Sequence, residues 1–270
     1  MIVISPALVL SPAAASYSLN NPLFGYRNFV TADGIVADTE EDDYPASNLA
    51  NPLTYPAAGW RAADTSAQYV TFTISEIDQV DYIGIAGHNF GSAAIALVLE
   101  SFIAGVWTEI MPERMPADDS PLLYRFEAQS VSQIRIGLAS GMAPARAAVV
   151  YIGPSLVHQR RIYVPHSPLK LSRTTDVVSG MSEASDFLGR IVLGEYVGTG
   201  IDLKNLTPDW YRANFDPFVV AAKTAPFFFA WRPLHYPNEV GFCWLTNNPK
   251  PVNQRNNGMM SVQLQVNGIV

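Results

Sequence analysis

The sequence predicts a mainly β protein in two parts: an N-terminal jelly-roll β-sandwich, then an α+β domain in which an antiparallel sheet packs against one main helix. Short apolar segments separated by turn signals fill residues 26–157. A capped amphipathic helix, at about 207–223, precedes aromatic strands. Charge also divides the chain. Residues 1–160 hold seven Arg, no Lys and 16 acidic residues, a balance of −9, whereas residues 161–270 hold four Lys, six Arg and eight acidic residues, a balance of +2.

Residues 1–25 are expected to form an extended N-terminal arm or edge strand. Residues 1–16 are apolar and end in Ala13-Ala14-Ala15-Ser16, as a secretion signal does. No Lys or Arg precedes this run, and Pro6 and Pro12 interrupt it, so an arm is favoured over an export signal. No segment approaches the roughly 18 uninterrupted apolar residues that a membrane span requires.

The second segment, residues 26–157, is predicted to be an antiparallel sandwich. Residues 68–74 alternate, with Tyr69 opposite Val70 and Phe72. Further strands are expected at residues 81–86, 94–102, 106–110, 122–127, 133–138 and 147–152. A hydrophobic content of 49% with 15% charged residues excludes a disordered chain, and the single Cys243 excludes an internal disulfide framework. The acidic balance argues against nucleic-acid binding.

The third segment, residues 158–270, is predicted to hold the helix and its sheet. Extended chain over 157–164, a Ser-, Asp- and Gly-rich stretch over 174–187 and a strand over 189–197 come first. Thr207 as N-cap, Pro208 at the first helical position and Asp209 then start the helix. Its apolar stripe is Tyr211, Phe215, Phe218, Val219 and Ala222, with a kink expected at Pro217 and an end at Pro226. Strands follow at 227–231, 240–245 and 261–266.

Short strings in the first part resemble the discoidin-type, galactose-binding-like jelly roll. They are Tyr-Pro-Ala-Ser-Asn-Leu at 44–49, Gly-Trp-Arg at 59–61, and the paired strands at 80–85 and 131–136, so the resemblance covers about residues 40–153. It implies structural roles for Asn48 and for the Trp60-Arg61 pair. In that family sugar or lipid contacts come from variable loops, so the resemblance transfers no binding site.

The layout of the second part is similar to that of distal tail and minor tail proteins of long-tailed phages. It consists of a polar loop at 182–189, a Gly-Arg strand, the Leu-Thr-Pro-Asp-Trp helix start, and the Pro-Phe-Phe-Phe and Gly-Phe-Cys-Trp-Leu strands. The resemblance covers about residues 160–270. It implies a tail-tube-like domain that forms a ring, six-fold in that family. Those proteins usually place the ring domain first, whereas here the sandwich comes first.

No motif indicates catalysis or a cofactor, and the chain is expected not to be an enzyme. His88, His158, His166 and His235 lie far apart and lack zinc-type spacing with Cys243. The Gly87-His88-Asn89-Phe90-Gly91 string lacks a nucleophile-elbow pattern and favours a turn. The acidic residues 40–43 are more typical of a solvated loop than of a calcium site. No catalytic, cofactor-binding or metal residue is assigned.

Aromatic residues give the candidate binding surfaces. Phe227, Phe228 and Phe229 must face both sides of a strand, so the run is either buried in two layers or covered by a neighbouring subunit. We favour the subunit and assign Phe227, Phe228, Phe229, Trp231 and Tyr236 to an oligomer interface. Tyr55, Trp60 and Trp107 are candidates for stacking on a surface sugar, although closure of the sandwich core is the competing interpretation.

The sequence thus predicts a non-enzymatic structural protein of a phage tail tip, in the virion and assembled in the host cytoplasm. Its expected partners are copies of itself in a ring, which the resemblance implies to be a hexamer, together with tail-tube and other tail-tip proteins. A host-surface glycan is an open alternative contact. Two other functions remain: a cell-surface carbohydrate-binding module, and an esterase or glycosidase, which would need a clustered triad or carboxylate pair that no motif indicates.

Overall fold

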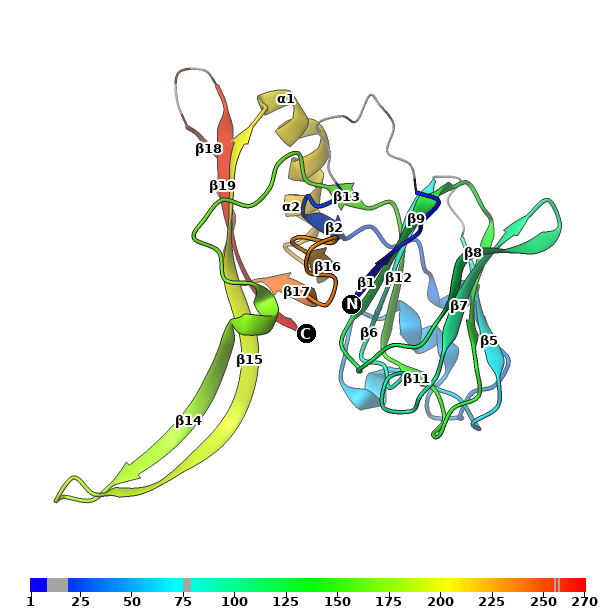
Figure 1. The fold of residues 1–270 in the computed structure, drawn as a ribbon, viewed down its shortest axis with the longest axis horizontal. Coiled ribbons are helices and arrows are strands. Elements are labelled where there is room, and N and C mark those ends of the chain that lie inside the picture. The colour runs from blue at the N-terminus through cyan, green and yellow to red at the C-terminus, as the bar shows by residue number, and fades with distance from the viewer. Residues whose placement is uncertain (9–18, 75–78, 255, 257) are drawn as a thin grey trace.

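The computed structural model of this chain is mainly β, as predicted, and describes residues 1–8, 19–74, 79–254, 256 and 258–270. Among the described residues, three large sheets, one two-stranded sheet and one helical segment make up the fold (Figure 1). An outer and an inner sheet form the N-terminal sandwich, the inner sheet also packs against a C-terminal sheet, and the helical segment covers the far side of that sheet. Within the described residues, no helix has the length and apolar character needed to span a membrane.

The sandwich agrees with the expected run of short strands. Its inner sheet has the order β1 (Ile2–Ile4), β9 (Leu122–Gln129), β6 (Val80–Ala86), β12 (Val149–Gly153). Its outer sheet has the order β3 (Ile35–Ala37), β5 (Gln68–Thr73), β10 (Gln133–Leu138), β7 (Leu97–Ile103), β8 (Val106–Arg114). A small pair, β4 (Trp60–Arg61) and β11 (Arg146–Ala147), and three short helices, η2 (Ala32–Gly34), η3 (Ala46–Ala50) and η4 (Pro56–Ala58), close one end. Val70 and Phe72 of β5 are buried and Tyr69 is exposed, which confirms the alternation.

The entry loop of the sandwich is fixed by the residues to which the discoidin resemblance gives structural roles. The Asn48 side-chain amide donates a hydrogen bond to the Gly59 carbonyl (3.1 Å). The Trp60 indole N–H donates to the Thr39 carbonyl (3.2 Å), and Arg61 lies over the Tyr44 ring. Because Trp60 is only 1% exposed, its ring closes the core and is not available for stacking on a sugar. The prediction of Trp60 as a surface-ligand residue is therefore wrong.

The first 25 residues were expected to form an extended arm or edge strand, and the structure places a strand at each end of them, with β1 at the edge of the inner sheet. Strand β1 pairs in parallel with β9 of the inner sheet. Strand β2 (Leu23–Gly25) instead pairs with two strands of the C-terminal sheet. The chain therefore begins in one sheet and crosses to the other before the sandwich is built. The signal-like segment at 13–16 lies outside the described residues.

The C-terminal sheet is antiparallel and holds eight strands. Their order is β13 (Leu156–Val157), β2, β16 (Phe227–Ala230), β17 (Val240–Leu245), β19 (Met260–Ile269), β15 (Phe187–Leu206), β14 (Arg173–Met181), with β18 (Val252–Asn253) paired to β19. One turn of 3-10 helix, η5 (Leu169–Leu171), precedes β14. Since β13 already pairs with β2, the chain returns to this sheet slightly before residue 158.

One helical segment covers this sheet, as predicted, but it is interrupted. It consists of α1 (Pro208–Trp210), a π-helical turn at Tyr211–Phe215 and α2 (Asp216–Ala221). The π turn lies directly before Pro217, where a missing N–H and a bulky ring oppose a regular α-helical ladder. The Thr207 hydroxyl makes no cap hydrogen bond and instead accepts one from Gln159 (3.1 Å), unlike its predicted role. The predicted apolar stripe is buried throughout.

The triple phenylalanine of β16 is covered within the chain itself. Phe227 and Phe229 pack among the residues under the helical segment, including Phe218. Phe228 faces the opposite way, against the inner sheet of the sandwich and Tyr151 (ring centroids 5.6 Å apart). All three are at most 1% exposed. The assignment of these three residues to an oligomer interface is wrong, because the sandwich supplies the second layer that we attributed to another subunit.

A long hairpin projects from the edge of the C-terminal sheet (Figure 1). Strand β15 pairs with β19 over 197–206 and continues past the sheet, where only β14 accompanies it. We call residues 173–196 the projecting hairpin. The sequence predicts a strand over 189–197, but it assigns no strand to the Ser-, Asp- and Gly-rich stretch over 174–187 or to the polar loop at 182–189. Instead β14 occupies most of the first stretch, and only residues 182–186 form the turn at the tip.

Candidate functional site

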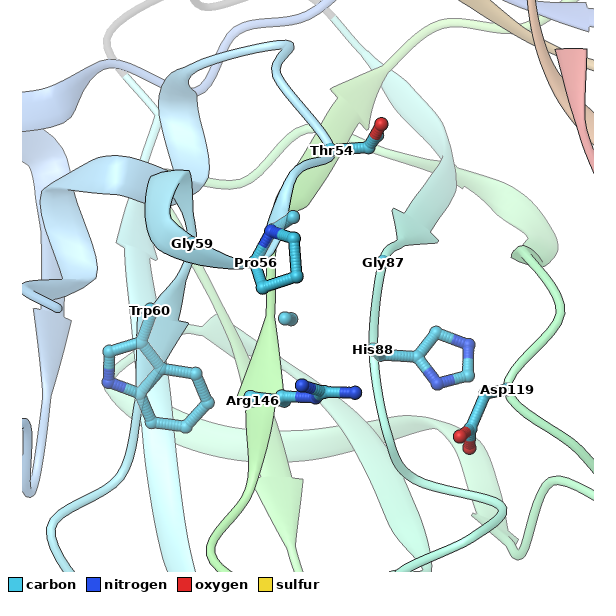
Figure 2. Close-up of a pocket in the computed structure, with 10 residues that line it drawn as sticks. Thr54, Pro56, Gly59, Trp60, Gly87, His88, Asp119 and Arg146 are labelled. Carbon is cyan, nitrogen blue, oxygen red and sulfur yellow. The ribbon is translucent and has the colours of Figure 1, made fainter. Parts of the chain in front are cut away.

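A small pocket lies where β4 and β11 meet the loops at one end of the sandwich (Figure 2). It encloses about 160 Å³. The residues around it come from four separate stretches of sequence: Thr54, Pro56, Gly59, Trp60, Gly87, His88, Asp119, Arg146, Ala147 and Ala148. Gly87 forms part of the wall in a left-handed conformation (φ 67°), and a Cβ there would come within 2.7 Å of Ala148.

Arg146 supplies the positive charge of this pocket. Its backbone N–H donates to the Asn89 side-chain oxygen (2.9 Å), which fixes the start of β11. Its side chain is exposed and extends across the pocket towards His88 (Figure 2). Asp119 lies on the same side as His88, and its carboxylate accepts a hydrogen bond from the Ser92 backbone N–H (2.9 Å). The pocket therefore offers a guanidinium with free donors and a carboxylate with free acceptor capacity.

His88 lines the pocket and has a structural role rather than that of a general base. Its Nδ1 accepts from the Phe90 backbone N–H (3.2 Å), so Nε2 carries the proton and donates to the Ser120 carbonyl (2.9 Å). The ring also stacks on Phe90 at 4.8 Å. Burial lowers the pKa of His88 to about 4, so the imidazole is neutral at neutral pH. With both nitrogens engaged, it holds the loop in place.

The aromatic residues predicted to bind a surface sugar are not brought together. Tyr55 is 56% exposed and lies between two residues that line the pocket, Thr54 and Pro56. Trp60 contributes only its buried edge. Trp107 belongs to β8 of the outer sheet, where it contacts Phe102 and the Arg135 guanidinium, and it does not line the pocket. Of the three, Tyr55 combines an exposed ring with neighbours in the sequence that line the pocket, although it is not itself part of the lining.

Acidic and thiol groups elsewhere are engaged in the fold. In the acidic loop, Glu40 accepts from the Ala46 backbone N–H (2.7 Å) and Glu41 pairs with Arg61 (3.2 Å). Across the described part of the chain, no group of three or more His, Cys, Asp or Glu side chains is placed to hold a metal ion. Cys243 is fully buried, and burial raises the pKa of its thiol, which opposes reactivity.

The projecting hairpin carries the second candidate surface. Large apolar side chains on both of its faces are 44–70% exposed: Val178, Met181, Phe187, Leu188, Ile191, Val192, Leu193 and Tyr196. Cross-strand pairs such as Val178 with Ile191 and Met181 with Phe187 bring them together across the ribbon. The sequence signal for this surface was the consecutive apolar run at 191–193, which cannot all face one side of a strand.

Two of the residues assigned to an oligomer interface do lie near the surface. Trp231 and Tyr236 stack on each other (5.2 Å, 5° between planes), and Arg232 lies over both rings. The Trp231 indole N–H donates to Glu239. Tyr236 is 43% exposed. This cluster closes the loop between β16 and β17 and lies apart from the projecting hairpin in the sequence.

Comparisons with known proteins give similarities of structure. No protein-family model and no curated protein sequence matches this chain. Among solved structures, the chitosan-binding module 1 of a Paenibacillus sp. IK-5 chitosanase/glucanase matches with a TM-score of 0.40 and 13% identity, over 47% of this chain and 98% of that one. The family 32 carbohydrate-binding module of Clostridium perfringens NanJ, solved with galactose, matches with a TM-score of 0.40 and 17% identity, over 46% and 97%.

A third match is the structure of SpGH29, with a TM-score of 0.40 and 13% identity. It covers 47% of this chain but only 28% of SpGH29. Each of the three similarities therefore extends over less than half of the present chain. What those proteins bind is a property of those proteins and assigns no ligand here.

Proposed function

We propose that this protein is a structural assembly subunit, in which the projecting hairpin of each copy is covered by a neighbouring copy in a homo-oligomer. The exposed apolar hairpin carries this proposal. An isolated two-stranded ribbon is marginal in water, and an exposed apolar edge strand invites pairing or aggregation. Covering its eight exposed apolar side chains, each of which exposes 44–70% of its surface, would contribute on the order of 10 kcal/mol.

The setting we propose is the tail tip of a long-tailed phage, with a ring built by the C-terminal domain and the sandwich facing outward. The resemblance of the layout of residues 160–270 to distal and minor tail proteins supports this setting. A hairpin that projects from the edge of the sheet suits a subunit that must reach its neighbour. On this proposal the protein is non-catalytic, belongs to the virion after assembly in the host cytoplasm, and contacts tail-tube and other tail-tip proteins.

The test is a comparison of oligomeric state between matched double variants. Leu188→Asp with Ile191→Asp places charge on the projecting hairpin, whereas Val106→Asp with Met142→Asp places it at equally exposed apolar positions of the sandwich. We expect the wild type and the sandwich variant to form the same oligomer by native mass spectrometry, and the hairpin variant to dissociate at concentrations at least tenfold higher. A wild-type monomer at every concentration, or a hairpin variant that assembles normally, contradicts the proposal.

A second candidate function is glycan binding by the sandwich, and the pocket of Figure 2 favours it. The guanidinium of Arg146 and the carboxylate of Asp119 suit the hydroxyls of one sugar unit. We propose that the exposed ring of Tyr55, which lies between the pocket residues Thr54 and Pro56 in the sequence, packs on the apolar face of that sugar. A glycan array followed by titration tests this. Arg146→Ala and Tyr55→Ala should each weaken a bound glycan at least tenfold, and Trp107→Ala should not. Equal effects of all three variants, or no bound glycan, would remove this candidate.

A further inference from the structure

The tip of the projecting hairpin is a compact acidic turn. Residues 182–186 are closed by hydrogen bonds from the Ser182 N–H to the Asp186 carbonyl and from the Ser185 N–H to the Ser182 carbonyl (both 2.9 Å). The Ser182 hydroxyl also donates to the Asp186 carboxylate (3.1 Å). Glu183 and Asp186 are exposed, and within the described residues neither has a basic partner at ion-pair distance. The tip therefore presents two carboxylates on a fixed turn.

A basic depression lies on the loop that follows β13. It encloses about 380 Å³ and is lined by Asn21, Gln159, Arg160, Arg161, Ile162 and Tyr163. Arg160 uses its Nε to donate to the Asn205 carbonyl (2.7 Å), which orients the guanidinium and leaves its two terminal nitrogens for another acceptor. Arg161 is exposed as well, and neither arginine forms an ion pair within the part of the chain that the structure describes.

The tip and the basic depression lie at opposite ends of the C-terminal sheet (Figure 1). The green loop after β13 crosses the upper end, whereas the tip of β14 and β15 lies below and well outside the body. A tip therefore cannot meet the depression of its own copy. The nine residues of β14 span about 30 Å, roughly the width of a domain of this size, so the hairpin is long enough to cross a neighbouring C-terminal domain.

We propose that the acidic tip of one copy binds the Arg160–Arg161 depression of the next copy, with the carboxylates of Glu183 and Asp186 accepting hydrogen bonds from the two guanidinium groups. This inference rests on the proposed assembly function and names its contact. The acidic tip and the basic depression are complementary in charge, so we assign a second copy of this chain as the partner that binds the depression. Because donor and receiver are different surfaces, the contact is head-to-tail, and its repetition closes a ring or propagates a filament.

Charge-reversal variants of the full chain test this contact. Glu183→Lys with Asp186→Lys, and separately Arg160→Glu with Arg161→Glu, should each raise the concentration at which the oligomer dissociates by about tenfold at low salt. The quadruple variant that combines them should recover most of this loss, since opposite charges again face each other. Lys223→Glu with Lys250→Glu, two exposed lysines of the same domain, is the matched control and should assemble like the wild type.

The outcomes distinguish failure of this contact from failure of the proposed assembly function. If the charge variants assemble normally while Leu188→Asp with Ile191→Asp does not, the hairpin drives assembly and the Arg160–Arg161 contact is wrong. If the arginine variant weakens assembly but the tip variant does not, another acidic surface occupies the depression and the contact is again overturned. Loss in both doubles with recovery in the quadruple variant supports it. A wild-type monomer overturns both proposals.

Discussion

Gly84 and Phe228 lie in contact where the sandwich faces the C-terminal sheet. A Cβ on Gly84 would come within 2.5 Å of two ring carbons of Phe228, so glycine is required by the close approach of this ring. We predict that Gly84→Ala lowers the free energy of unfolding by about 1–3 kcal/mol through overpacking. Phe228→Ala, which leaves a cavity, should lower it by about 3–5 kcal/mol. Urea denaturation measures both.

The control for this pair is a double-mutant cycle. Phe228→Leu replaces the ring with a smaller side chain, which relieves the overpacking caused by Gly84→Ala. It should therefore lower the free energy of unfolding less in the Gly84→Ala background than in the wild type. Strictly additive effects would contradict the contact. Phe187→Ala, at a 70% exposed position of the projecting hairpin, should leave the stability of the monomer almost unchanged.

Two buried histidines predict a dependence of stability on pH. Burial lowers the pKa of His88 and of His158 to about 4 in the folded chain, from 6.5 when exposed. Between these values the unfolded chain binds protons that the folded chain does not, so this stability is present above pH 6.5 and is lost as pH falls towards 4. For each histidine, the change from pH 7 to pH 5 should lower the free energy of unfolding by about 2 kcal/mol. His88→Gln and His158→Gln should each reduce that slope in urea titrations. An unchanged slope in both would contradict the assignment.

At the scale of elements, the segments with a local signal were predicted well. Pro208 marks the start of the helical segment and Pro217 its interruption, because proline acts on the backbone within one turn. Strand β14 was missed. Its Ser, Asp and Gly residues favour turns locally, and pairing with β15 overrides that preference. Propensity could not show which strand would be its neighbour.

The projecting hairpin should show a large change in hydrogen exchange on assembly. Along β14 the backbone groups that face away from β15 have no further strand beside them in the described structure, and the hairpin contributes few side chains to the C-terminal core. In a dilute monomer we expect the amides of residues 177–180 and 190–193 to exchange quickly. In the oligomer they should exchange at least tenfold more slowly, as measured by mass spectrometry. Equal exchange in both states would mean that the neighbour covers another surface.

At the scale of the whole molecule, the two parts share a core and should unfold together. Tyr82 and Tyr151 of the inner sheet pack against Phe228 and Phe242 of the C-terminal sheet. We predict one urea transition, with tryptophan fluorescence and far-UV circular dichroism coinciding. The isolated segment 26–157 should be less stable and bind a hydrophobic dye, because it exposes that face. Two separated transitions in the full chain would contradict a shared core.

The shared core also explains what sequence reasoning could not reach. The run Phe227 to Phe229 shows that both sides of a strand are covered, but it cannot show that the second cover is the sandwich formed by an earlier part of the chain. The sequence also cannot predict which residues form the pocket. Arg146, Asp119 and Thr54 come from separate loops, and no spacing in the sequence links them. By contrast, burial of Trp60 was weighed correctly as the competing interpretation.

Strand β15 belongs to both the body and the projecting hairpin, and this gives the molecule a mechanical property. Eight residue pairs join its second half to β19, and the hydrogen bonds of an antiparallel ladder run perpendicular to the strand. A pull along the hairpin therefore loads these bonds simultaneously rather than peeling them apart one by one. Tension applied at the tip would be carried directly into the centre of the C-terminal sheet, so the hairpin can act as a tether as well as a contact.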